Sequence, residues 1–90
     1  MANIEFTSLF SNKAKKLIQR DHNLNSVFKK QFRLFTINPR YPTLHLHKLI
    51  GKRSEQFAIS ITGNLRALAI KSNTKTDTYI FFDIITHDEY

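Results

Sequence analysis

A chain of 90 residues can form one domain with a small core, because a domain of this size buries only about 60 to 65% of the surface that its unfolded chain exposes. The chain contains no cysteine, which excludes a disulfide framework and a thiolate metal site and fits a reducing compartment. Fourteen Lys and Arg against seven Asp and Glu give a net charge of +7, so we expect a partner of negative charge.

The first half of the chain predicts a short strand or extended lead-in at Ile4 and Phe6, followed by two helices. Thr7 or Ser8 can cap the first helix, and Asn38-Pro39 is expected to stop the second. Apolar residues recur at spacings of three and four, as amphipathic helices require. They are Leu9, Phe10, Ala14, Leu17 and Ile18 in the first helix and Leu24, Val27, Phe28, Phe32 and Phe35 in the second.

After Pro42 the apolar spacing changes to two, which predicts strands. Leu44 and Leu46 alternate with His45 and His47, and residues 57–62 alternate in the same way. Gly63-Asn64 suits a two-residue hairpin turn in which both residues tolerate positive φ. Residues 78–85 are apolar at both parities, which predicts the central strand.

These elements predict a single α+β domain over residues 1–90. Its two N-terminal helices should pack as a hairpin on one face of a twisted antiparallel sheet of three to four strands. If Leu44 and Leu46 face the helices, alternation places His45 and His47 on the opposite, open face.

The charge is unevenly distributed along the chain. No acidic residue occurs between His22 and Ser54, a stretch that contains seven Lys and Arg. Such a stretch attracts polyanions, so we expect a nucleic acid partner, and RNA rather than DNA. The ordinary alternative is a solvated helix face. No apolar run approaches the roughly 20 residues of a membrane span, and no secretory leader is evident, so a cytoplasmic location without membrane contact is predicted.

Three residues are candidates for the chemistry of RNA cleavage, namely His47, Arg66 and His87. The 2′-hydroxyl of RNA attacks the neighbouring phosphorus if one group removes its proton and another protonates the leaving oxygen. A free imidazole titrates at a pH of about 6.5 and suits both tasks. An arginine can stabilise the charge on the phosphoryl oxygens. The ordinary alternative for Arg66 is pairing with a surface acid such as Asp83 or Glu89.

Metal and cofactor chemistry receives less support from the sequence. His45, His47 and His87 could form a three-histidine metal site, but an H-x-H pattern alone is a weak indicator. No phosphate-binding glycine loop, dinucleotide fingerprint or serine-nucleophile motif occurs. We therefore predict no metal and no small-molecule cofactor.

Residues 38–52 (NPRYPTLHLHKLIGK), 57–70 (FAISITGNLRALAI) and 84–90 (IITHDEY) together resemble the RelE/ParE toxins of type II toxin-antitoxin systems, and most closely the RelE and YafQ-type branch. The resemblance implies a ribosome-dependent mRNA endonuclease that is neutralised by a cognate acidic antitoxin. It implies catalytic roles for His47 and His87 and phosphate handling by Arg66. The further residues expected to contact RNA are Lys48, Lys52, Arg53, Arg40, His45 and Tyr90, the last by stacking on a base.

Two alternatives remain open at this point. The ParE branch of the resemblance implies a poison of DNA gyrase that acts by binding. A degenerate, non-catalytic member that binds RNA or antitoxin is the other. It is motivated by Ile85, which stands where a glycine is usual, and by Asp83, which stands where some active relatives carry a cation.

Overall fold

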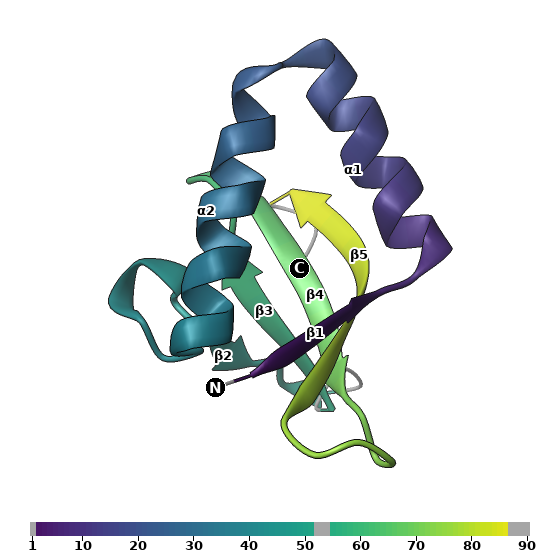
Figure 1. The fold of residues 1–90 in the computed structure, drawn as a ribbon, viewed down its shortest axis with the longest axis vertical. Coiled ribbons are helices and arrows are strands. Elements are labelled where there is room, and N and C mark those ends of the chain that lie inside the picture. Colours follow the sequence, from purple (N-terminus) through teal and green to yellow (C-terminus); the bar gives the residue numbers. More distant parts are fainter. Residues whose placement is uncertain (1, 52–54, 87–90) are drawn as a thin grey trace.

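The computed structural model describes residues 2–51 and 55–86 and has two helices on one face of a five-stranded sheet (Figure 1). In chain order the elements are β1 (Asn3–Phe6), α1 (Ser8–Arg20), α2 (Asn23–Ile37), a 3₁₀ turn η1 (Pro42–Leu44), β2 (His47–Lys48), β3 (Gln56–Ser60), β4 (Leu65–Lys71) and β5 (Thr78–Thr86). The predicted α+β fold with an N-terminal helical hairpin is therefore confirmed. Within the described ranges, no helix is long and apolar enough to cross a membrane.

The sheet differs from the prediction in size and direction. Its order is β1-β5-β4-β3-β2, so it has five strands rather than three to four, and β4 is the central strand rather than β5. β1 pairs with β5 in parallel, which makes the sheet mixed rather than antiparallel. An alternating pattern identifies a strand but contains no information about its partner, and these two strands lie far apart in sequence.

The helix ends follow local chemistry. Thr7 caps α1, because its side-chain oxygen accepts a hydrogen bond from the Phe10 amide at 3.1 Å. α2 ends at Ile37, immediately before Asn38-Pro39, as predicted. One predicted core position is wrong: Leu9 is 59% exposed, while its neighbour Phe10 is 3% exposed and takes the place in the core.

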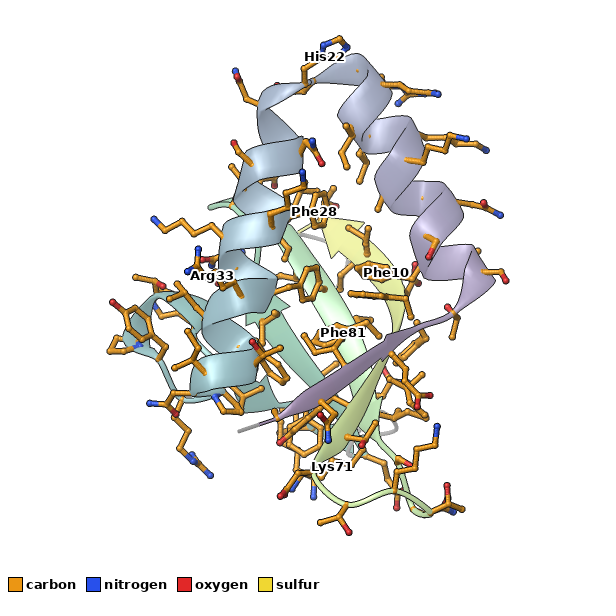
Figure 2. All side chains as sticks on the ribbon, in the orientation of Figure 1. Phe10, His22, Phe28, Arg33, Lys71 and Phe81 are labelled. Atoms are coloured by element: carbon orange, nitrogen blue, oxygen red, sulfur yellow. The ribbon has the colours of Figure 1, made fainter. Side chains whose placement is uncertain are left out.

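An aromatic cluster joins the helices to the sheet. In Figure 2, Phe10, Phe28 and Phe81 point toward one another between the two layers. The Phe81 ring packs edge-on against Phe32, with ring centroids 4.9 Å apart, and Phe35 and Phe81 are fully buried. Burying a phenylalanine side chain completely contributes about 1.5–3 kcal/mol, so this cluster is the main source of stability between the layers.

A second, smaller apolar cluster lies on the opposite face of the sheet. Its buried members are Leu49, Ala58, Leu68 and Ile85, and Phe82 packs against them. β5 therefore contributes apolar side chains to both faces, which explains why its sequence is apolar at both parities.

Candidate functional site

The segment that leads to His47 is not the continuous strand predicted from Leu44 onward. Pro42 begins a 3₁₀ turn that buries Leu44 completely, and His45 then adopts a left-handed conformation with φ of 48° and ψ of 43°. Only His47 and Lys48 pair as strand β2. The predicted faces nevertheless hold, because Leu44 and Leu46 pack in the helix-side core and His47 pairs with Ala58 of the opposite cluster.

The left-handed residue also orients the ring of His47. Nδ1 of His47 lies 2.9 Å from the backbone oxygen of His45. A carbonyl oxygen only accepts hydrogen bonds, so Nδ1 must donate. In the neutral ring the proton therefore sits on Nδ1, and Nε2 is the nitrogen that can accept a proton. In this tautomer Nε2 is the unprotonated nitrogen that a general base needs.

Arg66 lies where the β3–β4 hairpin returns to the sheet. Its Nη1 donates to the backbone oxygens of Thr62 at 2.9 Å, Leu65 at 3.3 Å and Gly63 at 3.4 Å. The predicted two-residue turn is wrong, because neither Gly63 nor Asn64 has positive φ. Instead, the Thr62 hydroxyl closes the turn by accepting hydrogen bonds from the amides of residues 64 and 65, each at 3.1 Å. The turn therefore holds the guanidinium at the end of the hairpin.

His47 and Arg66 lie on the same face of the sheet. Residues opposite each other in register share a face, as do alternate residues of one strand. His47 pairs with Ala58, and two residues further along β3, Ser60 pairs with Arg66. This face points away from the helices and is called the open face below.

His45 also lies on the open face, although it is not part of a strand. Its Nδ1 lies 3.3 Å from the Ser60 hydroxyl, directly beside the position of Arg66 in the register. Ser60 is 9% exposed and was not a predicted site residue. Its indication in the sequence is a polar side chain at the alternating position after Ala58. The open face thus brings together two imidazoles, a buried hydroxyl and a guanidinium.

The other predicted RNA contacts are distributed differently. Lys48 follows His47 and lies on the opposite side of β2, paired with Phe57. It lines a hollow of about 520 Å³ together with Lys71, whose Nζ lies 5.9 Å from the Phe57 ring centroid. Figure 2 shows Lys71 at the end of the molecule far from His22. Arg40 is exposed in the turn after α2. Lys52, Arg53, His87 and Tyr90 lie outside the described residues.

Asp83 has a cationic partner that the sequence analysis missed. Its Oδ1 lies 2.7 Å from Nζ of Lys13, a residue of α1. Asp83, the acid named as an ordinary partner for Arg66, thus pairs with α1. The described part of the chain holds no group of three side chains suited to a metal ion, and the three-histidine alternative remains untested because it includes His87.

No protein-family model matches the chain, and no curated protein matches it. Several solved structures do. A YoeB/ParE toxin from Agrobacterium tumefaciens is 13% identical, with a TM-score of 0.76, over 94% of this chain and 98% of that one. YafQ from Escherichia coli BL21(DE3) is 19% identical, with a TM-score of 0.72, over 98% and 96%. A copper-bound mutant toxin from Helicobacter pylori is 20% identical, with a TM-score of 0.72, over 99% and 98%. The chain therefore has the fold of the RelE/ParE-type toxins, as the sequence resemblance implied.

Proposed function

We propose that this protein is the toxin of a type II toxin-antitoxin system and that it cleaves mRNA on the ribosome. The observation that carries the proposal is the open face itself. There, a histidine whose Nε2 can accept a proton and an arginine anchored on a hairpin turn share one side of the sheet. The fold shared with YafQ and the YoeB/ParE toxin supports the same function.

The proposed reaction uses the 2′-hydroxyl of the message as nucleophile. Nε2 of His47 takes the hydroxyl proton, the oxygen bonds to the adjacent phosphorus, and the bond from phosphorus to the 5′-oxygen breaks. His87 then supplies the proton to the leaving oxygen, as the resemblance implies. Arg66 stabilises the negative charge that builds on the phosphoryl oxygens. Each proton transfer of this kind contributes about 10² to 10⁴ in rate.

The remaining predicted residues would hold the message in place. Lysine and arginine neutralise phosphates without reading the sequence, which suits Lys48, Lys52, Arg53 and Arg40. His45 would contact the RNA beside Ser60, and Tyr90 would stack on a base. In this proposal the basic stretch without acids is the electrostatic part of the RNA site.

We further propose that an acidic antitoxin binds this chain. The structurally similar YafQ has been crystallised in complex with its antitoxin DinJ. Between α1 and α2 lies a hollow of about 460 Å³ with a lining that is almost entirely apolar, and Phe6 in it is 47% exposed. Lys15 of α1 and Lys29 of α2 also line it. An amphipathic helix with carboxylates beside its apolar face would match this surface.

Cleavage by the purified protein tests the enzymatic proposal. Programmed ribosomes are mixed with the wild-type protein, with His47→Ala, with Arg66→Ala and with Lys16→Ala, a variant that removes one exposed charge from α1. We expect the wild type and Lys16→Ala to cut the message, and the two open-face variants to be strongly impaired while remaining folded. Intact messages with the wild type, together with normal growth of a bacterium that expresses it, would reject the proposal.

The same protein preparation also decides between the alternatives. Inhibition of DNA supercoiling by gyrase without mRNA cleavage would favour the gyrase poison. RNA binding that weakens steeply with salt, again without cleavage, would favour a non-catalytic binding protein.

A further inference from the structure

β5 has two halves with different neighbours. β1 pairs with β5 from Thr78 to Phe81, and among residues 2–51 and 55–86 no strand pairs with the same edge of the second half. α1 packs against β5 here instead (Figure 1). Two side chains bond to the backbone of this half. The hydroxyl of Thr7, which caps α1, donates to the Phe82 oxygen at 3.5 Å, and Nζ of Lys13 in α1 donates to the Ile84 oxygen at 3.0 Å.

These contacts surround a β-bulge. On the β4 side, Ala69 pairs with Phe81 but Leu68 pairs with Asp83, so Phe82 is an extra residue without a partner. The Asp83 carboxylate secures the bulge, because the same Oδ1 accepts hydrogen bonds from the Ile84 amide at 2.8 Å and from Nζ of Lys13 at 2.7 Å. Lys13 therefore binds two successive residues of β5, Asp83 through its carboxylate and Ile84 through its backbone oxygen.

The bulge decides which residue lies opposite Arg66. If the pairing of Ala69 with Phe81 continued without interruption, Ile84 would face Arg66, and Asp83 would face the fully buried Ala67. With the bulge, Ile85 faces Arg66 and Ile84 joins the helix-side core. A shift of one residue moves every later side chain of a strand to the other face.

We infer that Lys13 is a positioning residue for the open face. It holds the bulge in β5 through Asp83 and the Ile84 oxygen, and so it fixes the row in which Ile85, Arg66 and Ser60 lie side by side. The Lys13 and Asp83 side chains are 44% and 28% exposed, a setting in which an ion pair contributes little to stability but can still fix geometry. The inference rests on the proposed function, because the row concerned is that of the proposed phosphate-binding arginine.

The test compares four variants of the full chain. Lys13→Met keeps the length of the side chain but removes its charge and donors, and Asp83→Asn removes the ion pair from the other side. Lys13→Arg restores a cation with donors. Lys16→Met removes one exposed positive charge from the same helix and is the matched control.

We expect Lys13→Met and Asp83→Asn to lower the cleavage rate at saturating ribosome concentration by about 10- to 100-fold, the size of effect that a small misplacement of a catalytic group causes. The half-saturating concentration should stay within twofold, Lys13→Arg should recover most of the rate, and Lys16→Met should match the wild type. An unchanged rate in Lys13→Met, or an equal loss in Lys16→Met, would overturn the inference.

A second measurement separates this inference from the proposed function. The cross-strand nuclear Overhauser contacts between Arg66 and Ile85 report the register directly, whether or not the protein cleaves RNA. We expect them to weaken in Lys13→Met while the midpoint of unfolding changes little, and to return in Lys13→Arg. Contacts identical to those of the wild type in Lys13→Met would refute the positioning role even if cleavage were lost, and absence of cleavage by the wild type would refute only the proposed function.

Discussion

The two faces of the sheet are built from the same strands but serve different purposes. The helix-side face is covered by α1 and α2 and filled with phenylalanine rings, two of which are fully buried. The open face has a much smaller apolar cluster, bordered by His47 and Arg66. Polar side chains remain accessible on the open face, which neither α1 nor α2 covers, while most of the buried rings that stabilise the domain lie on the other face.

The strongest test of this difference between the faces is to remove a phenylalanine ring from the helix-side face. Phe81→Ala should lower the free energy of unfolding by about 3–5 kcal/mol, because it leaves a cavity among four neighbouring rings. Urea denaturation measures the loss. Phe6→Ala is the matched control and should cost clearly less, since Phe6 is 47% exposed. Equal losses in the two variants would mean that the burial of a ring does not determine how much it stabilises the fold.

On the open face we expect a large loss of activity and little loss of stability. His47→Ala should lower the rate of mRNA cleavage by about 10²- to 10⁴-fold, because a proton acceptor is lost. Its free energy of unfolding should stay within about 0.5 kcal/mol of the wild type, since the ring is exposed. Single-turnover cleavage and urea denaturation of the same samples provide both values. A large loss of stability would show that the open face also supports the fold.

The hollow between α1 and α2 is the surface on which binding of the proposed antitoxin can be tested. Ala14→Glu places a carboxylate in this apolar hollow and should weaken binding of the proposed antitoxin at least about tenfold, equivalent to about 1.4 kcal/mol. Asn12→Glu adds the same charge to an exposed position of α1 that does not line the hollow and should bind as the wild type does. Calorimetric titration measures both, and equal affinities would place the antitoxin elsewhere.

The smallest expected effect concerns the turn that holds Arg66. Thr62→Val removes the hydroxyl that closes this turn and should cost about 0.5–1.5 kcal/mol of unfolding free energy. Gly63→Ala should be nearly neutral, because Gly63 lacks positive φ and an added methyl group would meet no atom within 4 Å. Thermal unfolding compares them. A larger loss of stability in Gly63→Ala than in Thr62→Val would mean that the turn depends on its glycine, as the sequence suggested.

The parts of the fold that depend on local chemistry could be predicted from the sequence. Thr7 caps α1, and Pro39 stops α2, because both effects act within a few residues. Leu9 was misplaced because adjacent positions at the start of a helix fit an apolar stripe almost equally well. The packing of Phe10 against Phe81, which is far away in sequence, decided between them.

The geometry of the candidate site was harder to predict. Alternation of Leu and His predicts a strand, but the same pattern also fits a 3₁₀ turn followed by one left-handed residue. The chain adopts this second arrangement, with His45 as the left-handed residue. The bulge in β5 could not be predicted either, because the apolar residues on both sides of the Phe82-Asp83 pair show no change of alternation that would mark it. The roles of His47, Arg66 and His87 remain predictions that the cleavage experiments address.

The parallel pairing of β1 with β5 has a consequence for synthesis of the protein. Pairs between these strands span 75 positions, as from Asn3 to Thr78, and one of the fully buried rings of the aromatic cluster comes from β5. Pairing over such distances is slow to form, and it cannot begin until the later strand exists. While the ribosome is still making β5, β1 has no strand to pair with and the helix-side core lacks Phe81, so the nascent chain stays open to chaperones until β5 has been made.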